Sequence, residues 1–220
     1  MTEPQFIVIE GIDGSGKTYL AKRITDWLNA NEKDSAICTS EPCYRATVKE
    51  DVEIIGDYRP HPYYKDRIIH YAYIICPALD LGKHVVCDRF QLSTCVYQAE
   101  LETLFTPIYA EYGFYVLQPN IWKKISESEH GICKDPSWLI LIDPDIKDAA
   151  NRIWARGEEV NTKDLAWQKE KFVKLLGDFY RNSMAYLTGD VNIIRARTAD
   201  EAFEQFTERW NASSDDDSED

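Results

Sequence analysis

A short glycine-rich segment near the N-terminus constrains the fold of this chain more than any other feature. Residues 6–10 (FIVIE) form an apolar run typical of a strand, and residues 11–18 (GIDGSGKT) follow it directly. This spacing matches the phosphate-binding P-loop, in which main-chain N–H groups surround a phosphate and a Cβ would collide. The pattern predicts an ATP site formed by Gly11, Asp13, Gly14, Ser15, Gly16, Lys17 and Thr18.

Two side chains at the end of this loop carry most of its expected chemistry. Lys17 would reach the β- and γ-phosphates, and the hydroxyl of Thr18 would ligate Mg²⁺. Leu20, Ile24 and Leu28 then recur at helical spacing, so a helix begins here and contributes the positive end of its dipole. We therefore expect ATP and Mg²⁺ to bind where a strand passes into a helix.

Strands and helices alternate along the rest of the chain. Further strand-like runs occur at residues 35–40, 84–88, 138–144 and 191–194. Helical patterns occur at residues 45–55, 64–81, 146–155, 164–187 and 200–210, and a further one starts near residue 92 and continues past residue 98. Apolar residues in succession, as at 84–88, are typical of parallel strands that are buried on both faces. The sequence therefore predicts an α/β fold of the P-loop NTPase class, with three α/β/α layers and a five-stranded parallel sheet.

Length, charge and cysteine usage narrow the class of protein. We expect one domain over residues 1–212 and a disordered acidic tail over residues 213–220. The formal net charge of −13 argues against a nucleic-acid polymer as partner. No apolar run is long enough to span a bilayer and no signal peptide is evident. The six scattered cysteines favour reduced thiols and a cytoplasmic location.

A second group of polar residues follows two other strands. Asp88 and Arg89 come directly after the run at 84–88, and Glu41 follows the run at 35–40. In parallel sheets, ligands bind beyond the carboxyl ends of the strands, so these residues should lie near the P-loop. Arg89 offers a planar fork of donors suited to a phosphate. Asp88 would hold Mg²⁺ through water or fix the position of Arg89.

Several segments of the chain together resemble one family of P-loop kinases. Residues 88–98 (DRFQLSTCVYQ) look like the thymidylate kinase motif of Asp-Arg-aromatic, then Ser, then Tyr-Gln. Residues similar to the same family are found at 9–18, 63–67, 76–83, 139–143 and 152–158. The resemblance implies an enzyme that phosphorylates dTMP, or a related deoxypyrimidine monophosphate, to the diphosphate with ATP as donor and Mg²⁺ as cofactor. It also suggests a homodimer.

The resemblance implies roles for residues near the sugar and phosphate of the acceptor. Arg89 would bind the 5′-phosphate, which is the group that attacks ATP. Asp13 would face the 3′-hydroxyl. Tyr97 would crowd the 2′ position and so favour deoxyribose.

The same resemblance implies roles for residues near the acceptor base. Tyr63 stands where the family has phenylalanine and would stack on the pyrimidine. Arg67 would donate to a base oxygen. Thr94 or Gln98 would read the edge of the base.

The extra catalytic cations are expected from a mobile lid. Apart from Lys17 this P-loop carries no basic residue, and family members of this form supply the missing charge from the lid. The lid corresponds to residues 152–165. The resemblance therefore implies a catalytic set of Lys17, Arg89, Arg152 and Arg156, with Thr18 and Asp88 at the metal.

One turn departs from the family pattern. Residues 40–45 (SEPCYR) stand where the family has Arg-Glu-Pro-Gly-Gly-Thr, so the two glycines are replaced. This change indicates a reshaped acceptor pocket to which Glu41 and Arg45 would contribute. The lid also lacks the Asp-Arg pair that usually follows its arginine.

Two other functions remain compatible with the sequence. In deoxynucleoside kinases a carboxylate after the second strand acts as general base on a 5′-hydroxyl, and Glu41 occupies that position. Those enzymes usually have Glu-Arg-Ser where this chain has residues 88–90 (DRF). A non-catalytic ATP-binding module is the other alternative.

Overall fold

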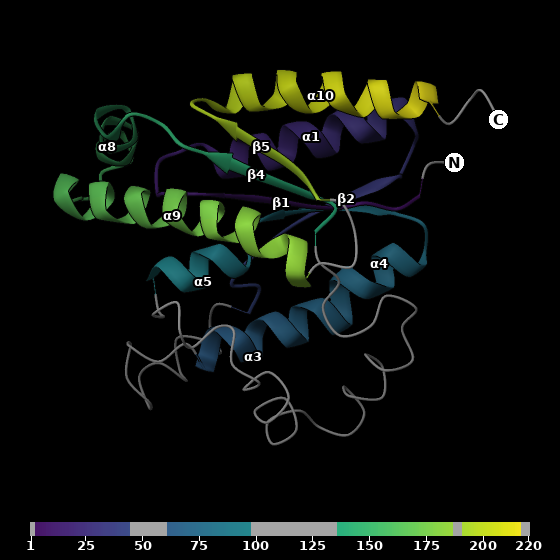
Figure 1. The fold of residues 1–220 in the computed structure, drawn as a ribbon, viewed down its shortest axis with the longest axis horizontal. Helices are drawn as coiled ribbons and strands as arrows, with labels where there is room; N and C mark the ends of the chain where they lie inside the picture. Colours follow the sequence, from purple (N-terminus) through teal and green to yellow (C-terminus); the bar gives the residue numbers. More distant parts are fainter. Residues whose placement is uncertain (1–2, 45–60, 98–135, 187–190, 217–220) are drawn as a thin grey trace.

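The computed structural model describes residues 3–44, 61–97, 136–186 and 191–216, which are arranged around one parallel sheet (Figure 1). Its strands are β1 (Phe6–Gly11), β2 (Ala36–Ser40), β3 (His84–Asp88), β4 (Trp138–Ile142) and β5 (Asn192–Ala196). The strand order is β2-β3-β1-β4-β5, and every neighbouring pair is parallel. The predicted five-stranded parallel sheet is confirmed.

Helices cover both faces of this sheet. The helices α1 (Lys17–Asn31) and α10 (Ala199–Asp216) lie together on one side, and the lower side in Figure 1 carries α3, α4, α5 and α9. The helical elements other than α1 and α10 are α3 (His61–His70), the π-helical turn η1 (Tyr71–Ile75), α4 (Cys76–Asp80), α5 (Gln91–Tyr97), α8 (Ile146–Ala155) and α9 (Thr162–Tyr186). This arrangement is the predicted three-layer fold.

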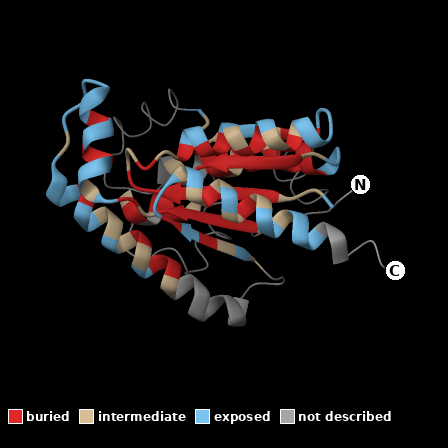
Figure 2. Cartoon of the chain, turned by 90° about the horizontal axis from the view of Figure 1, so that it is seen from above, coloured by how far each residue is buried: buried red, intermediate tan, exposed pale blue. Residues whose placement is uncertain are grey.

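Two hydrophobic cores hold the layers together, one on each face of the sheet. Side chains alternate along β1, so Ile7 and Ile9 pack with α1 and α10 while Phe6 and Val8 pack with the helices of the other face. All four are at most 1% exposed, and Figure 2 shows the strands buried beneath helices with exposed outer surfaces. Burial on both faces explains why the three central strands, β1, β3 and β4, are mostly apolar.

The register of the strands brings their carboxyl ends to one edge. Ile9 lies opposite Asp88 on β3, and Gly11 lies opposite Ile142 on β4. Ser40, the last residue of β2, also lies opposite Asp88. The loops that follow these strands, which carry the P-loop and Arg89, therefore begin side by side.

Two elements differ from the sequence-based expectation. The helix predicted at 64–81 contains a π-helical turn, η1, whose extra residue rotates the helix between His70 and Cys76. Arg67 and His70 therefore face the polar end of the sheet while Ile75 packs in the core. In addition, α10 continues to Asp216, into the segment for which we expected disorder.

Aromatic residues anchor α10 to the sheet as far as Trp210, and one hydrogen bond continues beyond it. Phe206 is fully buried, and Trp210 packs against it and against Trp138. The Ser213 hydroxyl donates to Trp210 O at 2.8 Å. Three expected segments lie outside the described residues: the helix at 45–55, the continuation of α5 beyond Tyr97, and the end of the acidic tail at 217–220.

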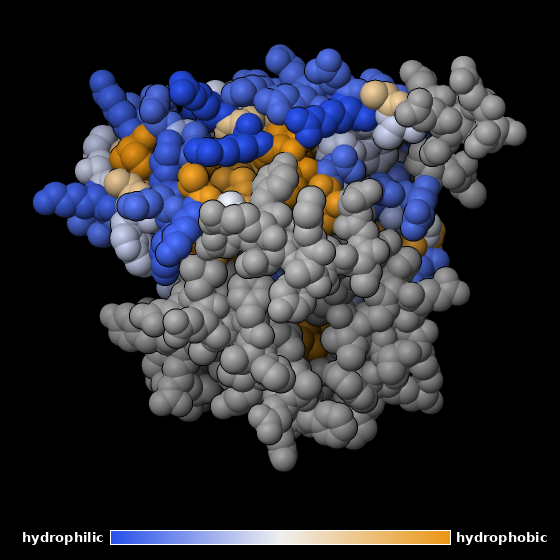
Figure 3. All heavy atoms as spheres, in the orientation of Figure 1, coloured by the Kyte–Doolittle hydropathy of each residue, from blue (hydrophilic) through white to orange (hydrophobic). Residues whose placement is uncertain are grey.

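One face of the molecule, as seen in Figure 3, is hydrophilic over α10. Figure 3 shows polar side chains along the top of the molecule, over α10, with apolar residues gathered beneath them toward the sheet. Within the described ranges, no helix is long and apolar enough to cross a membrane.

Candidate active site

The P-loop between β1 and α1 is packed too closely for side chains at two of its glycines, Gly11 and Gly14. A Cβ on Gly11 would lie 2.4 Å from Ile142 O, and a Cβ on Gly14 would lie 2.4 Å from Ala149 O. Gly14 also has a φ of +75°, which side-chain-bearing residues rarely adopt. The loop is therefore held between β4 and α8 with its backbone close to the strand ends.

Lys17 lies along the inside of this loop. Its Nζ donates to Gly11 O at 2.9 Å and to Ile12 O at 2.8 Å, and the residue is 5% exposed. Burial, together with the nearby positive charge of Arg89, lowers the pKa of Lys17 to about 8 although three carboxylates oppose the change. The ammonium group is therefore in place at the loop, but its charge is sensitive to mildly alkaline pH.

Thr18 and Asp88 form a pair of oxygen ligands beside the loop. The Thr18 hydroxyl donates to Asp88 Oδ2 at 2.5 Å across the gap between α1 and β3. Asp88 Oδ1 is buried and has no hydrogen-bond partner in the described structure. A hard cation such as Mg²⁺ prefers oxygen ligands, so this donor set fits the expected metal.

Arg89 is held in an unusual backbone conformation at the end of β3. Its φ is +72°, in the left-handed region that a non-glycine residue rarely occupies. Its guanidinium forms an ion pair with Asp13 of the P-loop and lies 5.3 Å from the centre of the Tyr97 ring. Burial alone would lower the pKa of Arg89, but Asp13 and Tyr97 raise it above its usual value, so the side chain is a permanent cation.

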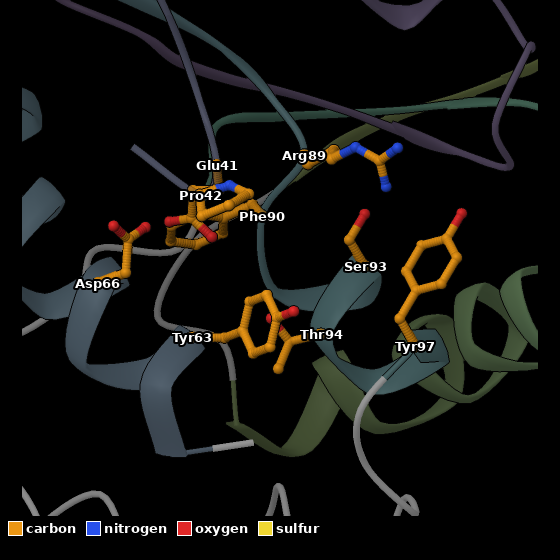
Figure 4. Close-up of a pocket in the computed structure, with 9 residues that line it drawn as sticks. All are labelled: Glu41, Pro42, Tyr63, Asp66, Arg89, Phe90, Ser93, Thr94 and Tyr97. Atoms are coloured by element: carbon orange, nitrogen blue, oxygen red, sulfur yellow. The ribbon is translucent and has the colours of Figure 1, made fainter. Parts of the chain in front are cut away.

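A pocket opens directly beside Arg89 (Figure 4). It is lined by Glu41, Pro42, Tyr63, Asp66, Arg89, Phe90, Ser93, Thr94 and Tyr97. In Figure 4 the Arg89 side chain lies at one end of this group, and the Tyr63 and Thr94 side chains lie at the other. Burial raises the pKa of Tyr97 to about 12, although the nearby Arg89 guanidinium opposes the rise. The buried Tyr97 hydroxyl makes no hydrogen bond of normal geometry within the described residues. A polar atom of this kind, facing a pocket, suits contact with a ligand.

Arg67 lies behind the pocket rather than on its wall. It is 2% exposed, and its Nε and Nη2 both donate to Glu41 Oε2, at 2.9 and 2.7 Å. Nη2 also donates to Phe90 O and, at 2.7 Å, to Thr94 Oγ1. The residue expected to contact the base therefore supports three residues that line the pocket, Glu41, Phe90 and Thr94.

The turn that departs from the family pattern is firmly held. Asp66 accepts hydrogen bonds from Cys43 N at 2.8 Å and from Tyr44 N at 2.7 Å, while its neighbour Arg67 binds Glu41. His70 Nδ1 lies 3.4 Å from Glu41 Oε1. The turn that carries Cys43 and Tyr44 in place of the two glycines is therefore anchored to α3 at both ends.

The two arginines of the expected lid have different surroundings. Arg152 Nη1 donates to Gly14 O at 2.9 Å, so this residue lies against the P-loop. Arg156 pairs with Glu158 at 3.3 Å, and both side chains are more than half exposed. The described structure thus brings only Arg152 to the loop, while Arg156 lies just after α8 on the surface. Arg45 and Gln98, also expected at the site, lie outside the described residues.

The sequence analysis assigned no role to one buried residue at the site. Glu10, the last side chain of β1 before the P-loop, is fully buried and accepts hydrogen bonds from Phe90 N, Ser93 N and the Ser93 hydroxyl. A carboxylate within an otherwise apolar strand was the available signal, because a buried charge requires specific partners.

Comparison with known proteins identifies the family. The model of the thymidylate kinase family matches residues 9–206. A probable thymidylate kinase of Pyrococcus horikoshii is 37% identical over 164 residues, which cover 69% of this chain and 71% of that protein. A probable thymidylate kinase of Pyrococcus abyssi is 30% identical over 168 residues, with the same two shares.

A solved structure agrees with the fold. The crystal structure of thymidylate kinase from Ehrlichia chaffeensis superposes with a TM-score of 0.59 at 18% sequence identity. The superposition covers 96% of this chain and 99% of that one. The family match over most of the sequence, the two relatives and the common fold lead to one conclusion: this chain belongs to the thymidylate kinase family.

Proposed function

We propose that this enzyme, a nucleoside monophosphate kinase by its family, transfers the γ-phosphoryl group of ATP to dTMP and yields ADP and dTDP. The observation that carries the proposal is the meeting of two anion-binding groups at one edge of the sheet. The P-loop with Lys17 provides one, and Arg89 provides the other, with Asp13 of the loop paired to Arg89. A donor phosphate and an acceptor phosphate bound there would face each other.

The chemistry follows from this placement of cations. Phosphoryl transfer requires in-line positioning and neutralisation of charge more than it requires a base. The phosphate of dTMP is already an anionic nucleophile, which Arg89 would hold and orient. Lys17 would stabilise charge on the β- and γ-phosphates, and Arg152, already against the loop, would add a third cation. Arg156 would join them when the lid at 152–165 closes.

Thr18 and Asp88 would hold Mg²⁺ at this edge. The buried Asp88 Oδ1 without a described partner and the adjacent Thr18 hydroxyl support the assignment. When bound, the ion neutralises charge on the donor phosphates. The remaining ATP contacts are proposed to come from the P-loop backbone at Gly11, Asp13, Gly14, Ser15 and Gly16.

The pocket beside Arg89 would receive the nucleoside of the acceptor. Tyr63 would stack on the base, and Tyr97 would face the sugar near its 2′ position. Asp13, which pairs with Arg89 in the structure, would also accept a hydrogen bond from the 3′-hydroxyl of the sugar. Thr94 and Gln98 would contact the edge of the base, together with Glu41, which Arg67 holds in place. Arg45 would be a further ligand of the phosphate.

The two alternative functions have weaker support. Glu41 lines the pocket, but one of its oxygens accepts two hydrogen bonds from Arg67 and the other faces His70. A carboxylate engaged in this way is poorly placed to remove a proton from a 5′-hydroxyl. The family match and the assembled set of cations argue against a non-catalytic module.

We further propose a cytoplasmic homodimer with one kinase domain over residues 1–212. The free thiols of Cys38, Cys43, Cys76 and Cys87 are compatible with a reducing compartment. Light scattering on the purified protein tests the dimer, which should have twice the chain mass of 25.5 kDa. A mass of one chain at micromolar concentration would reject it.

A coupled assay of ADP release tests the proposed activity. The purified chain is incubated with ATP, MgCl₂ and, in turn, dTMP, dUMP, dCMP and thymidine. We expect the highest kcat/KM with dTMP. If the protein is folded and no monophosphate raises ADP release above the rate with ATP alone, the proposal is rejected.

A further inference from the structure

Glu10 connects the donor side and the acceptor side of the site. It is the residue of β1 that immediately precedes the P-loop, and its side chain reaches the start of α5. Oε1 accepts from Phe90 N at 2.9 Å and from Ser93 N at 3.1 Å, and Oε2 accepts from the Ser93 hydroxyl at 2.5 Å. Glu10 is 0% exposed, so these bonds are made out of contact with solvent.

Arg89 is the residue that these contacts enclose. Its own N–H donates to Ile9 O at 2.9 Å, and the next N–H along the chain donates to Glu10. Both acceptors belong to residues of β1. The two N–H groups that donate to them lie on either side of the Arg89 Cα, where the backbone has a φ of +72°. Because a left-handed backbone is unfavourable for arginine, the neighbouring contacts must hold it in place.

A buried carboxylate is a costly way to fix a helix start. Burial raises the pKa of Glu10, and the Ser93 and Phe90 hydrogen bonds with the charge of Arg89 oppose that rise. An apolar side chain would fill the same space without this cost, but it could not accept three directed hydrogen bonds. The arrangement therefore favours a requirement for orientation over one for packing alone.

We propose that Glu10 is a positioning residue for phosphoryl transfer: it fixes the backbone of Arg89 relative to the P-loop and so aligns the acceptor phosphate with the donor. This inference rests on the proposed function, in which Arg89 binds the acceptor phosphate. Glu10 would act only through Arg89 and would touch neither nucleotide.

A double-mutant cycle between Glu10 and Arg89 tests the inference. Glu10→Gln keeps the shape of the side chain, but it removes the charge that strengthens the hydrogen bonds from Phe90 N and Ser93 N, and its NH₂ group cannot accept from the Ser93 hydroxyl. We expect kcat/KM for dTMP to fall at least about tenfold, because small misplacements of reacting groups are costly. The dissociation constant of ATP should change less than about twofold. In an Arg89→Met background, Glu10→Gln should cost less than about twofold.

Ser93→Ala removes the hydrogen bond between the Ser93 hydroxyl and Glu10 Oε2 without changing any residue of β1. We expect it to raise the KM for dTMP in the same direction as Glu10→Gln, and to lose its effect in the Arg89→Met background. Ser35→Ala is the matched control, because Ser35 is also buried but donates to Leu28 O far from the pocket. Its kcat/KM should stay within about twofold of wild type.

The outcomes separate this inference from the proposed function. If Glu10→Gln loses the same factor with and without Arg89, Glu10 has a general structural role and the inference is wrong. Calorimetric titration with dTMP allows the same cycle to be measured without turnover. A wild-type protein that binds dTMP but releases no ADP would therefore reject the proposed function, and the binding cycle would still decide on Glu10.

Discussion

Arg67 donates two hydrogen bonds to a single oxygen of Glu41, at 2.9 and 2.7 Å, and so supports a residue that lines the pocket beside Arg89. Both residues are buried, at 2% and 6% exposure. The pair joins α3 to the turn after β2, and through Thr94 it also reaches α5. The shape of the pocket therefore depends on an ion pair from which water is excluded.

Removal of one partner of this pair should destabilise the protein strongly. Arg67→Met would leave the Glu41 carboxylate buried without its guanidinium, which typically costs about 3 kcal/mol or more. In the double variant Glu41→Gln/Arg67→Met the loss should be smaller than the sum of the single losses. Urea denaturation measures these free energies of unfolding. A loss below about 0.5 kcal/mol for Arg67→Met, as for an exposed pair, would contradict the account.

Replacement of Arg89 should separate the two substrates. Arg89→Ala removes the proposed ligand of the acceptor phosphate but leaves the P-loop intact. We expect kcat/KM for dTMP to fall at least about 100-fold while the dissociation constant of ATP changes less than about threefold. The exposed Arg209, which donates to Ile193 O, provides the control variant Arg209→Ala. Equal losses for ATP and dTMP would count against the assigned role.

ATP use should decline at mildly alkaline pH. The pKa of Lys17 is lowered to about 8, so the free enzyme loses this positive charge as the pH rises through that value. The charge attracts the phosphates, and kcat/KM for ATP should therefore fall about tenfold for each pH unit above 8. A pH profile measured at saturating dTMP checks this. A flat profile up to pH 9.5 would mean that Lys17 keeps its proton.

Two glycines with the same φ allow the packing of the P-loop to be tested. Gly14 and Gly82 both have a φ of +75°, but only at Gly14 would a Cβ meet another group, Ala149 O at 2.4 Å. Gly82→Ala should cost about 1 kcal/mol of stability and leave the KM for ATP unchanged. Gly14→Ala should raise that KM at least about tenfold, because the loop must move. Similar kinetics of the two variants would show that backbone strain alone matters.

Much of the fold could be predicted because its signals are local. The alternation of apolar runs and helical patterns predicted all five strands, and the strand at His84–Asp88 has the expected bounds. The P-loop was recognisable because its spacing is required within one short segment. The π-helical turn at η1 was not predicted, since it depends on how one helix must face both Glu41 and the core.

The contacts within the site were harder to predict because they join distant residues. Glu10 is separated from Ser93 by 83 positions, and Arg67 from Glu41 by 26. The sequence indicated that Arg67 would be a donor, but not that Glu41 and Thr94 would be its partners. The choice among possible partners is made by tertiary packing, which local patterns do not encode.

Direct detection of the product tests the central claim most sharply. The enzyme is incubated with ATP labelled at the γ-phosphate, with dTMP or thymidine as acceptor, and the nucleotides are separated by chromatography. If Arg89 and the P-loop hold two phosphates face to face, the label appears in dTDP when dTMP is supplied. Label in dTMP formed from thymidine, with none in dTDP, would contradict the account.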